Sequence, residues 1–516
     1  MYTNATLNNG YVYSFYPCGY VPMRTDNTML WVRYKTAAER AKARPVISGY
    51  ATEVGAYVDT PDRELYIDRS AHVSDGDRPL RNWDECISLS MLYHVGNDYP
   101  NDRFMINHTS FSLKENELGM RSKWLQDIQT NKTVICDSGG FQLRSGKEYW
   151  IDPEDLASFY NSFVDEGVTL DIPIPTYNRE LLTRMLKVQE KNSKFLMKHV
   201  DRNVRIANVA HGIDHADFSF VRERLFEDEE MDILCIPSSH ILPDIKSIDR
   251  LTYHLTHGMR YRQYHLLGVY NMTWLSLAIK LMVEFNKTQK EPILLTSDAS
   301  SSIYSASSLR YHKQVMPYRS VSRWPIGLTA PAGGKQNMPS KVLPCNCPVC
   351  STIKYIDVIN VLGDINIAAL LTRHNEIETV QWTKLMCEAA VTMDMKDYLA
   401  FCLAQNQSKD KRSITEAFEY LTVFLNEGWE KAHKKFSHRI QTLYNQPKIA
   451  REALYEGSRD DGLHENEDVN ALNKHLSNVL QRYERFYKTG KKPKLDKGNG
   501  KSFHQLISGS NALQSK

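Results

Sequence analysis

The chain has 516 residues, of which 42% are hydrophobic and 24% are charged. A single hydrophobic core rarely organises so long a chain, so two or three domains are expected. No apolar run reaches the roughly 18 residues of a transmembrane helix, and the N-terminus lacks the basic and apolar segments of a signal peptide. We therefore expect a cytoplasmic protein without a membrane partner. The net charge of +3 creates no global field that would indicate a nucleic-acid partner, although local charge clusters still could.

Residues 1–85 are rich in tyrosine and contain short alternating stretches such as LWVRY and ELYID. We interpret them as a β-containing N-terminal extension. Residues 86–376 differ, because short apolar runs alternate with longer helical patterns. Strands are expected near 87–92 and 104–108, and then at TVICD, GVTLDIPI, RIANVAHG, DILCIP, HLLGV and ILLTSD.

Strand–helix alternation of this kind predicts an α/β fold with a parallel sheet covered by helices. The number of runs favours an eight-stranded (β/α)8 TIM barrel over residues 86–376, and a doubly wound sheet is the alternative. Residues 377–516 carry apolar residues at spacings of three and four, which predicts a helical C-terminal region. Its end is basic: from residue 481 on, nine Lys or Arg residues and two acids give a local charge of +7. We expect this tail to contact a phosphate backbone, and a solvated tail is the alternative.

Three of the apolar runs end in an acid or contain one: Asp137, Asp171 and Asp298. A single aspartate at a strand end is often the N-cap of the next helix. Three of them at equivalent places are harder to explain by capping alone, because the C-terminal strand ends of a barrel line its active site. Carboxylates around one cavity are typical of glycosidic-bond chemistry, in which one attacks the anomeric carbon and another moves a proton.

A turn with few side chains follows Asp137. Its glycines would allow a flat ligand to approach the backbone closely, and its aromatic residue could stack on that ligand or simply belong to the core. The residues of this turn are Ser138, Gly139, Gly140, Phe141 and Gln142.

Three cysteines lie within six residues, Cys345, Cys347 and Cys350, and His374 follows them. Cys-x-Cys-x-x-Cys with a distant histidine predicts a closed tetrahedral Zn²⁺ site. Four protein ligands leave no open position, so the expected zinc is structural and the zinc-binding subdomain spans residues 345–374. The alternative for His374 is a surface histidine on a helix, in which case the fourth ligand is unknown.

The motif Asp-Ser-Gly-Gly-Phe-Gln, the later strand-end aspartate and the cysteine pattern together resemble the tRNA-guanine transglycosylase superfamily. The resemblance covers about residues 86–376 and includes HLLGV, with Gly268, which is similar to the strand before the family's nucleophile. It implies a zinc-bearing (β/α)8 barrel that exchanges guanine for a 7-deazaguanine. By position, Asp298 resembles the nucleophile, Asp137 the general acid and base, and Asp171 the acid that reads the guanine edge. The turn after Asp137 would then form the base pocket.

The chain also departs from the family's pattern. His211 and Gly212 stand where the family usually has Gln-Gly, and the pocket loop is replaced by LCIPSSH, residues 234–240, which contains no acid. Without an acid there, an uncharged substituent such as a nitrile is favoured over an aminomethyl cation. The Pro-Thr-Arg-x-x-Arg segment of the bacterial tRNA enzymes is absent, and so are the strand-rich domains of the archaeal ones.

These losses resemble the 7-deazaguanine DNA transglycosylases of phages and bacterial DNA-modification islands. The expected reaction is insertion of 7-cyano-7-deazaguanine into DNA with release of guanine, in the host cytoplasm if the protein is phage-encoded. A tRNA substrate is the first alternative. A catalytically silent nucleic-acid-binding subunit is the second, although such subunits tend to lose the acids that this chain retains.

Overall fold

A computed structural model gives the structure of the chain. The residues that it describes are 5–7, 10–17, 29–33, 64–68, 85–88, 103–108, 133–144, 150–173, 178–212, 215–225, 232–237, 244–257, 261–268, 272–299, 310–312, 323–325, 364–405, 411–444 and 469–493.

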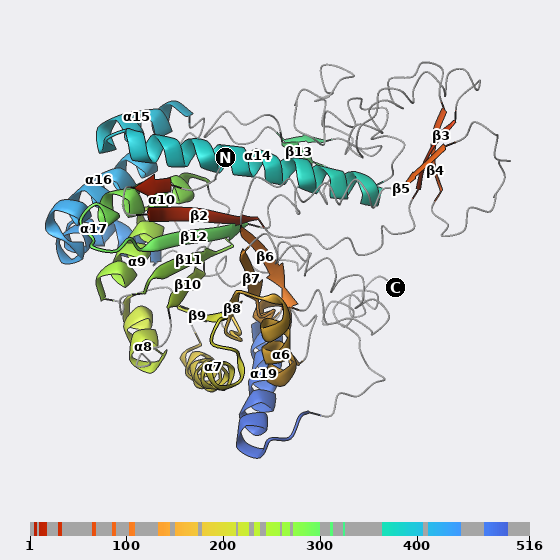
Figure 1. The fold of residues 1–516 in the computed structure, drawn as a ribbon. Helices are drawn as coiled ribbons and strands as arrows, with labels where there is room; N and C mark the ends of the chain where they lie inside the picture. Colours follow the sequence, from red (N-terminus) through yellow and green to blue (C-terminus); the bar gives the residue numbers. More distant parts are fainter. Residues whose placement is uncertain are drawn as a thin grey trace, which may run out of the picture.

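The centre of the described structure is a nine-stranded sheet that curls round on itself (Figure 1). In spatial order its strands are β1 (Ala5–Leu7), β2 (Gly10–Pro17), β12 (Leu294–Ala299), β11 (Gln263–Leu267), β10 (Ile233–Pro237), β9 (Arg205–Val209), β8 (Glu166–Val168), β7 (Thr133–Asp137) and β6 (Arg103–Asn107). Every neighbouring pair from β2 round to β6 is parallel, and only β1 is antiparallel to its neighbour. The two ends of the parallel run, β2 and β6, contact one another.

The expectation of a parallel sheet covered by helices is confirmed. Its closure into a TIM barrel remains a prediction, because no hydrogen-bonded ladder joins β6 to β2 within the described ranges. Two strands of the sheet, β1 and β2, were not expected there. Both come from the N-terminal extension, and β2 pairs with β12 in the register Tyr16 to Asp298.

The strand expected near 87–92 was wrongly placed in the main sheet. It is described as β5 (Glu85–Ser88), which pairs with β3 (Met29–Arg33) in a three-stranded antiparallel sheet that also contains β4 (Glu64–Asp68). A further antiparallel pair joins β13 (Arg310–His312) to β14 (Arg323–Pro325).

Helices follow most strands of the parallel run and cover the outer face of the sheet (Figure 1). They are α5 (Gly140–Arg144), α6 (Pro153–Phe163), α7 (Arg179–His199), α8 (His215–Leu225), α9 (Asp244–His257) and α10 (Met272–Asn286). Local sequence explains where two of them begin. The Asp152 carboxylate caps α6 by accepting from the Glu154 N–H at 3.0 Å, and Pro153 takes the first helical position, where no N–H is needed. The Asn178 side chain caps α7 in the same way.

The described parts of the C-terminal region are helical, as expected, although α14 begins before the expected boundary at residue 377 and runs through it. The described helices are α14 (Asp364–Thr392), α15 (Met395–Gln405), α16 (Lys411–Glu427), α17 (Trp429–Tyr444) and α19 (Val469–Thr489). They pack on the helices of the sheet: α14 on α10, α16 and α17 on α9, and α19 on α7. Their apolar residues, such as Tyr420 and Tyr483, belong to the same buried core as the helices around the sheet. None of the helices in the described ranges has the length and apolar character needed to cross a membrane.

Alternation along the strands decides which side chains reach the inner face of the curled sheet. In β7, Val134 and Cys136 belong to the large core under the helices, whereas Ile135 belongs to a smaller core formed by strand residues. Because side chains alternate in a strand, Asp137 points to the same inner face as Ile135. Asp298 likewise points away from the face that buries Leu295 under the helices.

Candidate active site

Three aspartates gather where the parallel strands end. Asp137 is the last residue of β7, Asp298 is near the end of β12, and Asp171 follows β8 by three residues. They are close enough for the charges of Asp171 and Asp298 to affect the ionisation of Asp137. The structure therefore brings together the three acids that the sequence singled out.

Asp137 is held by two donors. The Asn107 side-chain amide donates to Oδ2 at 2.8 Å, and the Gly139 N–H donates to Oδ1 at 3.3 Å. Burial raises the pKa of Asp137 to about 7, and the charges of Asp171 and Asp298 act in the same direction, against the two hydrogen bonds. A carboxyl group with a pKa near neutrality can both donate and accept a proton at ordinary pH.

Asp171 has a different setting. The Ser138 hydroxyl donates to Oδ1 at 3.3 Å, and His211 Nε2 lies 2.9 Å from Oδ2. Ser138 is fully buried, and Asp171 and His211 are each 6% exposed. Ser138, from the turn predicted to form the base pocket, and His211, which stands where the family usually has Gln, therefore both contact the acid predicted to read the base.

Two groups hold the Oδ1 oxygen of Asp298. His265 Nε2 lies 3.1 Å from Oδ1, and the Gly268 N–H donates to the same oxygen at 2.8 Å. The other ring nitrogen of His265 is 2.8 Å from the Thr296 hydroxyl, which sets the orientation of the ring. Gly268 has φ +66°, a conformation that favours glycine and turns its N–H toward the carboxylate.

The structure explains why glycines follow Asp137, and the explanation differs from the expected approach of a flat ligand. A Cβ on Gly140 would lie 1.4 Å from the backbone carbonyl oxygen of Asp171, so this glycine makes room for the segment that carries Asp171. Gly139 has φ +85°, and Gly212, beside His211, has φ +143°. Phe141 and Gln142 lie in the first turn of α5 and are partly exposed, and Gln142 Oε1 accepts from Asn107 at 3.4 Å.

Sequence reasoning missed Asn107 and His265. Asn107 is the last residue of β6, beside Asp137 in the strand register, and His265 is fully buried in β11, beside Thr296. The available signal was a polar residue at the end of RFMIN and another inside the apolar run QYHLL. A buried polar residue in a strand needs a partner, which is the reason to examine such positions.

The predicted zinc site lies mostly outside the described residues. Cys345, Cys347 and Cys350 are not among them, whereas His374 is 1% exposed within α14, so a surface position for this histidine is wrong. A buried imidazole suits a metal ligand, but it is only one of the four expected, and the zinc site stays a prediction.

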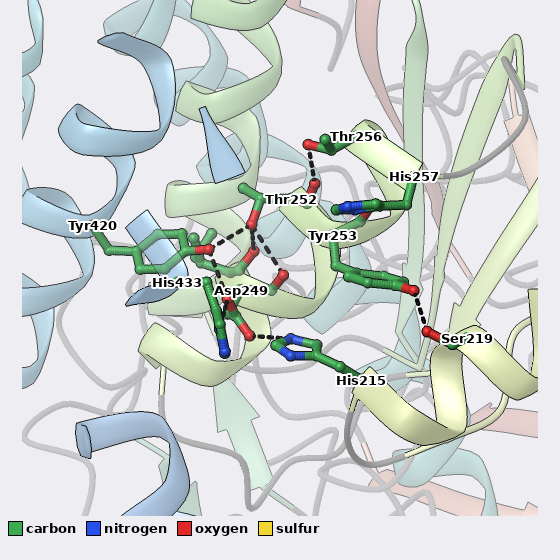
Figure 2. A network of polar contacts seen from close by, with 10 residues as sticks. His215, Ser219, Asp249, Thr252, Tyr253, Thr256, His257, Tyr420 and His433 are labelled. Atoms are coloured by element: carbon green, nitrogen blue, oxygen red, sulfur yellow. Dashed lines mark hydrogen bonds and ion pairs between the residues drawn. The ribbon is translucent and has the colours of Figure 1, made fainter. Parts of the chain in front are cut away.

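A different group of side chains does lie close enough to bind a metal ion. It consists of His215, Asp249 and His433, the single such group found in the described ranges (Figure 2). Burial of Asp249 opposes its ionisation, but hydrogen bonds from both histidines hold the pKa of this carboxyl below its ordinary value.

Comparison with models of known protein families gave no match, and comparison with curated proteins gave none either.

Proposed function

We propose that the chain is a base-exchange transglycosylase that replaces guanine in DNA with a 7-deazaguanine, most specifically 7-cyano-7-deazaguanine. The observation that carries the proposal is the convergence of Asp137, Asp171 and Asp298 at the carboxyl ends of parallel strands, with the pKa of Asp137 near 7. We also propose that the curled sheet closes as a (β/α)8 barrel, whose active sites form at this end of the strands.

In the proposed reaction, a guanine leaves the base stack and enters the site. A carboxylate oxygen of Asp298 attacks C1′ of the sugar as the glycosidic bond breaks, and Asp137 gives a proton to the departing guanine. The incoming base then loses a proton to Asp137 and displaces the aspartate from C1′. Two inversions give net retention at C1′.

The environments of the three acids support these roles. Asp298 has one oxygen fixed by His265 and Gly268, which orients a nucleophile. Asp171 accepts from Ser138 and contacts His211, and a carboxylate can accept from the adjacent N1–H and amino group of guanine. The proposed Cys345, Cys347, Cys350 and His374 zinc would stabilise the fold and takes no part in these steps.

The test is incubation of the full chain with labelled 7-cyano-7-deazaguanine and, separately, duplex DNA, single-stranded DNA or tRNA. We expect label in DNA and little in tRNA, and the reverse result would establish the tRNA alternative. Asp298→Ala should abolish incorporation and the covalent protein–nucleic acid adduct seen on a denaturing gel. Asp201→Ala, on an exposed turn before β9, is the control.

Adduct formation also separates an enzyme from a silent subunit. A wild-type chain that binds DNA but forms neither adduct nor product would contradict the proposal in favour of a binding subunit. An undiminished adduct in Asp298→Ala would indicate that Asp137 is the nucleophile.

A further inference from the structure

A second group of ionisable side chains lies away from the aspartate site, where α8, α9 and α17 meet (Figure 2). His215 opens α8, Asp249 lies within α9, and His433 lies in α17 of the C-terminal region. His215 Nε2 is 2.7 Å from Asp249 Oδ2, and His433 Nδ1 is 3.0 Å from Asp249 Oδ1. With one ligand atom taken from each residue, the three atoms lie within 4.8 Å of one another.

We propose that His215, Asp249 and His433 bind a divalent transition-metal ion of the zinc class. Imidazole nitrogen and carboxylate oxygen are ligands that Zn²⁺ prefers, with bonds of about 2.1 Å that place neighbouring ligand atoms about 3.4 Å apart in a tetrahedral site. The distances of 2.7 Å and 3.0 Å from the two histidines to Asp249 would have to lengthen by about 0.4 to 0.7 Å. An entering ion would replace the proton that each histidine shares with Asp249.

The surroundings hold the three groups in place. His433 stacks on Trp429 with ring centroids 4.9 Å apart, and His215 stacks on Tyr253 at 5.2 Å. The Tyr420 hydroxyl donates to Asp249 Oδ1 at 2.7 Å. Such outer contacts orient metal ligands and limit the cost of assembling a site.

The burial of the ligands suits an ion that enters from solvent. The Asp249 side chain is 1% exposed, whereas His215 and His433 are 24% and 21% exposed. Three protein ligands leave at least one position for water. Because α8 and α9 cover the sheet and α17 belongs to the C-terminal region, a bound ion would cross-link the two parts of the molecule.

Co²⁺ is the probe that separates this site from the cysteine cluster. Thiolate ligands give Co²⁺ an intense charge-transfer band, whereas a site of two histidines and one aspartate gives only weak visible absorption. The full chain is freed of metal with a chelator and titrated with Co²⁺. We expect one binding component without thiolate charge transfer, which His433→Gln weakens by roughly tenfold or more. His438→Gln, an exposed position of the same helix, should leave this component unchanged.

If His433→Gln folds poorly, thermal unfolding provides a second test of the metal site. Adding Zn²⁺ to the metal-free wild type should raise the melting temperature, and His215→Gln should reduce the rise, with circular dichroism confirming that the helices persist. A folded wild type without the cysteine-independent Co²⁺ component overturns the proposal. So does a component that persists unchanged in both histidine variants. Either result leaves the cluster as a hydrogen-bond network between helices.

Discussion

At the residue scale, Asp137 links the proposed chemistry to stability. Its pKa is about 7 in the folded chain and about 3.9 in an unfolded one. A raised pKa means that folding favours the protonated carboxyl, so this contribution to stability is present at low pH. It is lost as the pH rises from about 4 through about 7.

We therefore predict that Asp137→Asn is more stable than the wild type above pH 7, by up to about 4 kcal/mol, and that the difference disappears toward pH 4. Urea unfolding of both proteins at pH 5 and pH 8 measures it. Asp201→Asn, on an exposed turn, serves as the control. A stability difference that does not change with pH would mean that Asp137 is ionised throughout.

His265 is predicted to position Asp298 without contacting the substrate. His265→Phe removes the contact to Asp298 Oδ1, so the rate of adduct formation should fall by roughly tenfold or more while DNA affinity is retained. His265→Gln should restore part of the rate, because its amide can donate to the same oxygen. Equal loss in both variants would indicate that the site has collapsed, and thermal unfolding would reveal it.

Gly140 gives a prediction that does not depend on function. Gly140→Ala would force a Cβ to within 1.4 Å of the Asp171 carbonyl oxygen, so the two segments must separate. We expect a loss of roughly 3 kcal/mol or more in unfolding free energy. Gly428→Ala is the matched control, since nothing lies within 4 Å of its Cβ and only its φ of +86° opposes the change. That strain is worth about 1 kcal/mol, so equal losses would contradict the packing argument.

The sequence indicated the three aspartates but missed two of the side chains that hold them, Asn107 and His265, for a physical reason. An acid after an apolar run is a local pattern. Asn107 and His265 matter only because β6 lies beside β7 and β11 beside β12 in one register. Such neighbours are set by strand pairing between distant segments, which a single sequence does not specify.

At the scale of elements, helices and buried strands were predictable because their apolar patterns are local. TVICD, RIANV and QYHLL all form strands of the parallel sheet, and the C-terminal helices follow the spacing of their apolar residues. β2 was not predicted to join them, because backbone pairing to β12 leaves no trace in its side-chain pattern. The boundary near residue 85 remains a prediction, and the β2–β12 pairing crosses it.

Deleting residues 1–20 tests this pairing. The deletion removes β1 and β2 and leaves β12, which carries Asp298, as an unpaired edge. We expect a lower melting temperature, aggregation and loss of adduct formation. If residues 1–85 were an independent extension, the truncated chain would instead melt at the wild-type temperature.

At the scale of the whole molecule, part of the basic tail is already used. Lys492 pairs with Asp152 and Glu154 near the start of α6, and Glu484 of α19 pairs with Arg184 of α7. These contacts fasten α19 to the helices around the sheet. The lysines beyond residue 493 are therefore the better candidates for contacts with phosphate.

Truncation at residue 493 removes four lysines and one aspartate but leaves α19 and its ion pairs intact. If the lysines contact DNA, affinity should fall and the log–log dependence on salt should flatten by about 0.9 per lost phosphate contact. Binding titrations at several salt concentrations measure this slope. An unchanged slope would exclude the tail and direct attention to the lysines of α17.

The pairing of β2 with β12 also has a consequence during synthesis. β2 cannot pair with β12 until Asp298, which lies 282 residues after its partner Tyr16, has been synthesised. At translation rates of about 5–20 residues per second, that delay is about 14–56 seconds. Until then β1 is the one described ladder partner of β2 that has been synthesised, so most of the parallel sheet is made before β2 can pair within it. A nascent chain of this protein is thus exposed to chaperones and proteases until β12 has emerged.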